Sequence, residues 1–91
     1  MNASRENQEK LDTLGGRIRA MRQAHNLTVT DTAARVGISR VQLTQWEAGR
    51  VLEPGAYQLL RFTKLVDVNL NWLLERAGPD PEILRRPKRQ K

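Results

Sequence analysis

The sequence predicts an all-α fold, a bundle of five helices with no sheet. Three observations support this. Apolar residues recur at helical spacing within residues 11–24 and 56–66, helix-capping residues precede several short apolar runs, and no segment alternates apolar and polar residues as a half-buried strand does. With 91 residues, the chain is long enough for one small hydrophobic core and too short for a second.

The first predicted helix lies within residues 11–24, where Leu11, Leu14, Ile18 and Met21 follow the helical period. The pair Gly15-Gly16 is unfavourable in a helix interior, because glycine gains more backbone freedom than any other residue when a helix unfolds. We therefore expect the firm part of this helix to begin near Arg17.

Two short helices follow at once. Thr28 can cap the second helix, with Asp31 at the capping-box position, and Gly37 suits the left-handed residue that ends it. Ser39 can cap the third helix, which runs to about Glu47. Two short helices joined by a few residues that include a glycine are typical of a helix-turn-helix.

The fourth predicted helix covers residues 56–66, and the fifth follows Asn69 and ends before Gly78-Pro79. Outside the helices, the sequence predicts a polar N-terminal arm over residues 1–10 and a basic, flexible tail over residues 79–91, with a domain of residues 11–78 between them. The end of the tail, "RRPKRQK", is either an electrostatic arm for DNA or an ordinary solvated segment.

The composition excludes several kinds of function. The absence of cysteine and the single histidine leave no disulfide framework and no metal cluster, and no glycine-rich phosphate loop or nucleophile–base set is present, so we expect neither enzyme activity nor a cofactor. No apolar run approaches the roughly 20 residues of a membrane span, which predicts a cytoplasmic protein. The net charge of +6 favours a polyanionic partner such as nucleic acid.

The segments "RIRAMRQAHNLTVTDTAARVGISRVQLTQWEAGRVLEP" and "LLRFTKLVDVNLNWLL" together resemble the Cro/CI-type (XRE-like) helix-turn-helix family. Within that family the similarity points to the DNA-binding domains of lambdoid phage repressors, and it covers residues 14–77. The resemblance implies a bundle of the phage-repressor type in a bacterial or phage-encoded protein. It also implies double-stranded DNA as the partner, with the third helix in the major groove.

The third predicted helix carries the expected base-reading surface. If Leu43 points inward, Val41 and Gln45 lie roughly 160° away on the outward strip. Arginine pairs well with guanine and glutamine with adenine, while valine can contact the C5-methyl of thymine. The alternative is that Val41 is an exposed valine without a role. The predicted base-reading residues are Arg40, Val41, Gln42, Thr44 and Gln45.

Phosphate contacts are expected from Thr28, Val29 and Thr30 at the start of the second helix, and from Ser39 and Arg50. In the family, the position of Val29 is often a glutamine that contacts phosphate, so here the contact would come from the backbone. Glu53 would repel a phosphate, and Thr32 replaces a usual core leucine. The resemblance also implies that Arg22 and Glu47 form a structural salt bridge.

A single helix-turn-helix contacts few base pairs, so we expect a homodimer whose recognition helices lie about 34 Å apart. The predicted dimer interface is Leu70, Trp72 and Leu73 on the last helix. The alternative is that Trp72 and Leu73 close the core.

The sequence thus predicts a sequence-specific transcriptional regulator, a dimeric repressor that reads a pseudo-palindromic operator. Two alternatives share the fold: an antitoxin of a toxin–antitoxin pair and a restriction-modification controller. A protein partner, such as a toxin or RNA polymerase, is not identified by the sequence.

Overall fold

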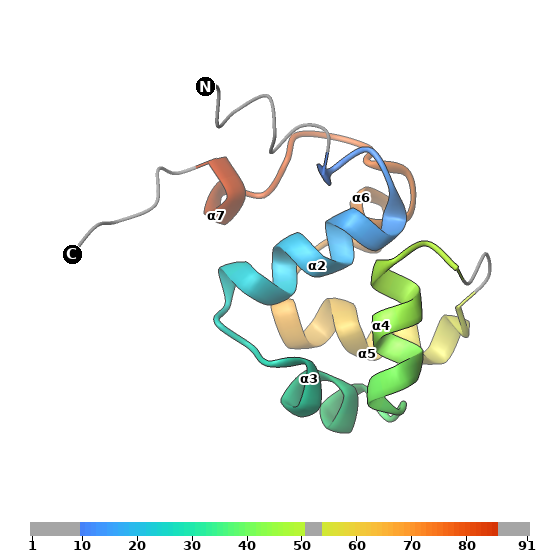
Figure 1. Ribbon diagram of the computed structural model, residues 1–91. Helices are drawn as coiled ribbons and strands as arrows, with labels where there is room; N and C mark the ends of the chain where they lie inside the picture. The colour runs from blue at the N-terminus through green and yellow to red at the C-terminus, as the bar shows by residue number, and fades with distance from the viewer. Residues whose placement is uncertain (1–9, 51–53, 86–91) are drawn as a thin grey trace.

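The computed structural model describes residues 10–50 and 54–85, which contain six helices and no strand (Figure 1). The helices are α2 (Leu14–Ala24), α3 (Val29–Val36), α4 (Arg40–Glu47), α5 (Ala56–Val66), α6 (Leu70–Glu75) and α7 (Glu82–Arg85). The all-α prediction is confirmed. The count of five helices is not, because α7 adds a short helix that the proline-rich sequence around it did not predict.

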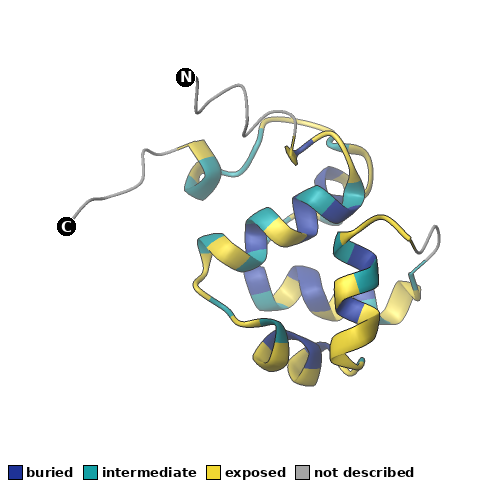
Figure 2. Ribbon diagram, viewed as in Figure 1, coloured by how far each residue is buried: buried dark blue, intermediate teal, exposed yellow. Residues whose placement is uncertain are grey.

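The helices enclose a single core, and their buried sides face one another (Figure 2). Helix α2 packs against α4 and α6, while α3 packs against both α4 and α5. The fully buried side chains of the core include Ile18, Met21, Val36, Leu43, Phe62, Val66 and Leu73. The third helix of the sequence prediction, α4, is therefore held from behind by α2 and α3, with its other side left to solvent.

Helix α2 begins at Leu14, so the expectation that it starts near Arg17 was wrong. Thr13 caps it, since the Thr13 hydroxyl accepts a hydrogen bond from the Gly16 N–H at 3.0 Å. A side chain at position 15 would collide with the carbonyl oxygen of Trp46 and come within 2.6 Å of that of Glu47. Gly15 thus lets α2 approach the end of α4 closely, and this packing outweighs the low helix propensity of glycine.

The predicted caps of the helix-turn-helix are present. Thr28 accepts from the Asp31 N–H at 3.0 Å, and α3 ends at Gly37, whose φ of 90° is left-handed. Ser39 and Gln42 form a full capping box: the Ser39 hydroxyl accepts from the Gln42 N–H at 3.0 Å, and the Gln42 side chain accepts from the Ser39 N–H at 2.8 Å. These caps fix the turn between α3 and α4 locally.

Thr32 is the weak point of the core. It stands where the family resemblance implies a core leucine, is fully buried, and its hydroxyl has no hydrogen-bond partner among residues 10–50 and 54–85. A buried hydroxyl without a partner costs about 1–3 kcal/mol of stability.

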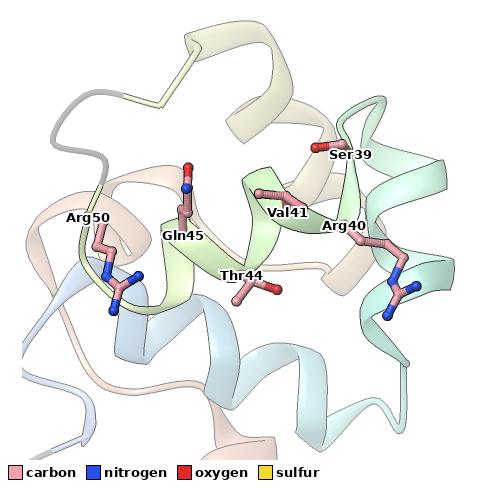
Figure 3. A pocket seen from close by; sticks show the side chains of 6 residues that line it. All are labelled: Ser39, Arg40, Val41, Thr44, Gln45 and Arg50. Carbon is pink, nitrogen blue, oxygen red and sulfur yellow. The ribbon is translucent and has the colours of Figure 1, made fainter.

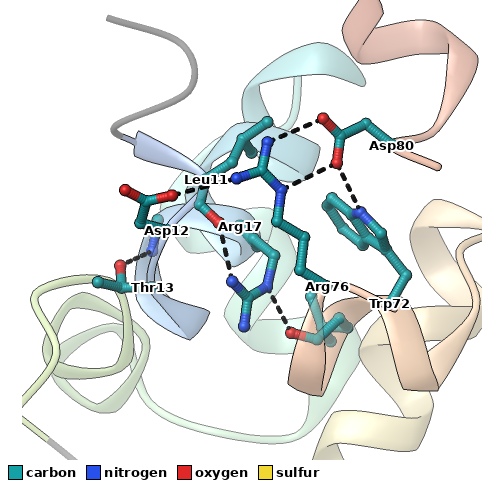
Figure 4. A network of polar contacts seen from close by, with 9 residues as sticks. Leu11, Asp12, Thr13, Arg17, Trp72, Arg76 and Asp80 are labelled. Carbon is teal, nitrogen blue, oxygen red and sulfur yellow. Dashed lines mark hydrogen bonds and ion pairs between the residues drawn. The ribbon is translucent and has the colours of Figure 1, made fainter. Parts of the chain in front are cut away.

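Near the N-terminal end of α2, five side chains belong to a network of polar contacts that we call the polar clasp: Asp12, Arg17, Trp72, Arg76 and Asp80 (Figure 4). Arg17 is buried, and its guanidinium donates to the carbonyl oxygens of Leu11 at 2.8 Å, Leu73 at 2.8 Å and Leu74 at 3.1 Å. The last two carbonyls lie in the final turn of α6, where a cation is favoured by the helix dipole.

Arg76 and Asp80 make up the outer half of the clasp. The Asp80 carboxylate accepts from Arg76 at 2.9 and 3.1 Å and from the indole N–H of Trp72 at 2.9 Å, while Arg76 also donates to Asp12 at 3.1 Å. Hydrogen bonding to Arg76 holds the pKa of Asp80 below its usual value, and the same bond raises the pKa of Arg76. Burial lowers the pKa of the Arg17 guanidinium.

The polar clasp ties residues after Pro79 to the bundle. The sequence assigned these residues to the tail, yet Ile83 and Leu84 on α7 pack, half-buried, against the core, and α7 contacts α2. Asp80 holds this segment through Trp72 on α6 and through Arg76, the residue that follows α6. The tail residues 86–91 and arm residues 1–9 lie outside the described residues.

Candidate nucleic-acid interface

The two sides of α4 differ as the sequence analysis expected. Leu43 is fully buried and Trp46 is 5 % exposed, whereas Val41 is 65 % exposed. Leu43 and Trp46 are three residues apart and share the inward side, which leaves the opposite strip open to solvent. Val41 is therefore a large apolar side chain on an outward, largely polar surface.

That outward strip borders a shallow hollow in the protein surface, lined by Ser39, Arg40, Val41, Thr44, Gln45 and Arg50. Figure 3 shows Arg40 and Arg50 at opposite ends of α4, with Val41, Thr44 and Gln45 between them. The structure thus brings together four of the five predicted base-reading residues and two of the predicted phosphate contacts. None of the lining residues is acidic, so the hollow has a positive and hydrogen-bonding character.

Gln42 is the predicted base-reading residue that does not line the hollow. Its side-chain oxygen is engaged by the Ser39 N–H in the capping box, so only its amide NH₂ remains to contact a ligand. The side chains of Thr44 and Gln45, by contrast, make no hydrogen bond within the described residues. Both are free to donate and to accept.

The predicted phosphate contacts at the start of α3 have mixed surroundings. Thr28 and Thr30 are exposed, while Val29 is half-buried and packs against the core. The Thr28 hydroxyl accepts from the Asp31 N–H, so it keeps its own hydrogen for donation. Asp31 is also exposed in this first turn and would oppose a bound anion. Glu53, the other predicted source of repulsion, lies outside the described residues.

Arg22 and Glu47 form the ion pair that the family resemblance implied. The guanidinium donates to the two carboxylate oxygens at 2.6 and 3.0 Å, and its third bond goes to the Leu27 carbonyl oxygen at 2.9 Å. Because Arg22 is on α2 and Glu47 ends α4, the pair fixes α4 against α2. A forked geometry of this kind is specific as well as strong.

The predicted dimer interface is mostly inside the chain. Trp72 is 2 % exposed and Leu73 is fully buried, so both close the core, which is the alternative stated above. Leu70 is half-buried, and Leu74, four residues later on α6, is 41 % exposed. Of the three predicted interface residues, only Leu70 thus keeps surface for a second copy.

Sequence reasoning missed one further arrangement beside the turn. The Arg61 guanidinium lies over the Tyr57 ring at 5.8 Å, and it also approaches Gly37 between α3 and α4. Spacing of four residues on one helix could have indicated the Tyr57–Arg61 contact, whereas the approach to Gly37 depends on tertiary packing.

The described residues meet neither the requirements of a metal site nor those of a membrane-spanning helix. They contain no group of three or more His, Cys, Asp or Glu side chains placed to hold a metal ion. None of the helices described is long and apolar enough to cross a bilayer.

Comparisons with known proteins agree with the helix-turn-helix fold. A family model described as a helix-turn-helix domain matches residues 15–79. The uncharacterized HTH-type transcriptional regulator YobD of Bacillus subtilis (strain 168) is 31 % identical over 71 residues, which are 77 % of this chain and 62 % of YobD. This chain therefore spans less than two thirds of that relative.

Two solved structures share the fold. The crystal structure of the P22 c2 repressor protein in complex with synthetic operator 9T matches with a TM-score of 0.66 and 31 % identity, covering 70 % of this chain and 96 % of the repressor chain. The nuclear magnetic resonance structure of the P22 c2 repressor DNA-binding domain matches with a TM-score of 0.63 and 31 % identity, covering 68 % and 80 % of the two chains.

Proposed function

This chain belongs to the helix-turn-helix domain family, and on that premise we propose that it is a transcriptional repressor that reads a pseudo-palindromic DNA operator as a homodimer. The observation that carries the proposal is the exposed hollow along α4, which gathers Arg40, Val41, Thr44 and Gln45 without any acidic neighbour in its lining. The similarity to a repressor solved with an operator supports DNA as the ligand.

Base reading is assigned to the outward side of α4. Arg40 can donate two hydrogen bonds to guanine, and Gln45 can donate and accept at adenine. Val41 is suited to the thymine C5-methyl, which is the apolar feature that an unmodified major groove offers. Thr44 is free to bond to either kind of base edge, and Gln42 contributes only through its amide NH₂.

Phosphate contacts are assigned to the two ends of the hollow and to the start of α3. Arg50 lies at one end, Ser39 at the other, and the N–H groups at residues 28–30 begin α3. Each phosphate neutralised by a cation contributes a slope of about 0.9 in log affinity against log salt. An Arg50→Ala variant should therefore lower the salt slope by about 1 per half-site and leave sequence preference unchanged.

The dimer is assigned to the exposed face of α6. Leu70 and Leu74 are four residues apart and keep apolar surface, whereas Trp72 and Leu73 have none to offer. Two leucines provide little apolar surface, so we expect a dimer that forms at high concentration or on the operator.

Sedimentation of the free protein and of its complex with DNA measures the state of assembly. A Leu74→Lys variant should weaken assembly without unfolding the chain.

Selection of bound duplexes from a random pool tests the function as a whole. We expect an inverted repeat whose half-sites are about 10 base pairs apart, centre to centre. An Arg40→Ala variant should select a motif with a relaxed preference at one base pair of each half-site. A pool that shows no enriched motif would contradict the proposal.

Replacement of thymine by uracil tests the role of Val41 separately. Within the selected motif, one thymine at a time is replaced by uracil, which removes only the C5-methyl. The wild-type chain should lose affinity at one such thymine per half-site, and the Val41→Ala variant should not distinguish the two bases there. Equal losses in both chains would show that Val41 does not contact the methyl.

A further inference from the structure

The hollow beside α4 combines one apolar side chain with several groups of adaptable hydrogen bonding. Val41 is the apolar member and is 65 % exposed, so its methyl groups meet solvent in the described structure. Thr44 and Gln45 flank it, with side chains that have no partner within the described residues. The hollow is therefore suited to a ligand that presents a methyl group beside a polar base edge.

Thymine is not the only base that presents this combination. Methylation of cytosine at C5 puts a methyl group at the same place in the major groove. The two bases differ next to that methyl, where thymine carries the O4 acceptor and cytosine the N4 amino donor. Unmethylated cytosine has the donor and no methyl.

The side chains around Val41 can accommodate this exchange of acceptor for donor. The Gln45 amide carries both an acceptor oxygen and a donor NH₂, and the Thr44 hydroxyl can play either part. Their lack of partners in the structure leaves both choices open. Gln42 could not adapt in the same way, because its oxygen is already bonded to the Ser39 N–H.

Discrimination between cytosine and its methylated form then depends on Val41. The partner that best selects the cytosine amino group is a carboxylate, and none lines the hollow. Arg40 can bond to the paired guanine, but guanine is the same whether or not its partner is methylated. The methyl group is thus the feature that separates the two forms for this surface.

We propose that the hollow formed by Arg40, Val41, Thr44 and Gln45 binds 5-methylcytosine in the place of thymine, so that cytosine-C5 methylation of an operator strengthens its binding. The inference rests on the proposed function and specifies a second ligand for the same site. Its consequence is regulatory. A cytosine in the Val41-facing position makes a weak site that a cytosine-C5 DNA methyltransferase converts into a strong one.

Four duplexes test this inference. They are built on the selected operator and carry thymine, uracil, cytosine or 5-methylcytosine at the Val41-facing position, paired with adenine or guanine as required. That position is found by the uracil scan described above, as the thymine whose replacement is silent in Val41→Ala. Affinity is measured by fluorescence anisotropy at one fixed salt concentration for the wild-type chain and for two variants.

Val41→Ala removes the apolar contact, and Leu60→Ala is its matched control. Leu60 is also a large apolar residue on a helix surface, 39 % exposed, but it lies on α5 and does not line the hollow. For the wild-type chain and Leu60→Ala, burial of one methyl group should make 5-methylcytosine bind about fourfold more tightly than cytosine per half-site. The duplex with thymine should bind more tightly than the duplex with uracil by a similar factor. Val41→Ala should reduce both ratios to about one.

The outcomes separate the inference from the function it rests on. One outcome is that the thymine duplex binds more tightly than the uracil duplex while 5-methylcytosine binds no better than cytosine. The hollow then reads thymine alone, and the inference is overturned although the proposed function stands. A methylation effect that survives in Val41→Ala would assign the methyl contact to another residue and also overturn it. If no duplex is selected from the random pool, the proposed function is wrong, and the inference that rests on it is wrong as well.

Discussion

Arg40 and Arg50 beside α4 make no side-chain hydrogen bond or ion pair within the described residues, whereas Arg17 and Arg76 in the polar clasp are held by protein acceptors. The same side chain therefore has two uses in one small domain. A guanidinium bonded to carbonyl or carboxylate oxygens stabilises the fold and has few donors left for a ligand. One whose donors face water adds little to folding and is free to meet a polyanion.

We infer that stability depends mainly on the polar clasp and recognition mainly on the outer side of α4. Helix α4 contributes its buried side to the core and keeps its outer side free, while the polar clasp binds the chain segments around α6 together. Substitutions in the polar clasp should change the free energy of unfolding and leave sequence preference intact. Substitutions of the base-reading residues Arg40, Val41, Thr44 and Gln45 should change sequence preference and leave the free energy of unfolding nearly unchanged.

The largest effect is expected from Arg17→Met, which keeps the length of the side chain and removes the guanidinium. Three buried or partly buried carbonyl oxygens lose their donor, so the free energy of unfolding should fall by about 3–5 kcal/mol. Urea denaturation measures the loss. The matched control is Arg19→Met on the exposed side of α2, which should cost less than about 0.5 kcal/mol. Equal losses for both variants would remove the distinction between the two kinds of arginine.

Arg22→Met should lower the free energy of unfolding by about 2–4 kcal/mol. The reason is that the variant leaves the Glu47 carboxylate without its cationic partner, at a place where both side chains are about nine-tenths buried. At a temperature where the variant is still folded, it should select the same DNA motif as the wild-type chain. Selection and thermal denaturation on one preparation measure both properties. A changed motif with unchanged stability would mean that Arg22 acts in recognition rather than in support.

Asp80→Asn should lower stability by about 1–2 kcal/mol at neutral pH, because it weakens the bonds to Arg76 and Trp72. Since the folded chain holds the pKa of Asp80 below its unfolded value, this contribution is present above about pH 4 and is lost as the pH falls through the lowered pKa. The difference between wild type and variant should therefore shrink in acid. The control is Glu75→Gln, which changes an exposed acid on α6. A difference in stability between wild type and Asp80→Asn that stays constant from pH 7 to 2 would contradict the lowered pKa of Asp80.

The smallest effect is a gain. Thr32→Val keeps the shape of a fully buried side chain and removes the hydroxyl that has no partner, so stability should rise by about 1 kcal/mol. Thermal denaturation should show a higher midpoint with unchanged DNA affinity. A loss of stability would indicate that the hydroxyl has an acceptor, such as a bound water. A buried polar group in this fold is thus expected to stabilise it only where the group has a hydrogen-bond partner.

Much of the fold follows from signals that are close together in the sequence. Thr28, Ser39 and Asn69 each bond to a backbone N–H two or three residues later, so the sequence could predict where three helices begin. The outward placement of Val41 likewise depends only on its angle from Leu43 along one helix. The outer side of α4 is predictable for this reason: the residues that line the hollow all lie between Ser39 and Arg50.

The errors concern contacts between distant residues. Gly15 was judged by helix propensity, and the close approach of Trp46 that requires a glycine there could not be read from the sequence. Arg17 was expected as the start of the firm part of a helix, yet two of its three acceptors are 56 and 57 residues away. Trp72 was placed in the dimer interface, whereas the structure buries it in the core, with its indole N–H donating to Asp80 at 2.9 Å.

Backbone amide chemical shifts recorded during titration with the selected duplex show whether DNA contacts the outer side of α4, since they report contact in both regions at once. We expect the largest changes at residues 28–31, 39–45 and 50, with little change in the polar clasp and α7 apart from any due to self-association at Leu70 and Leu74. Large changes confined to residues 72–85, with the outer face of α4 unaffected, would contradict it.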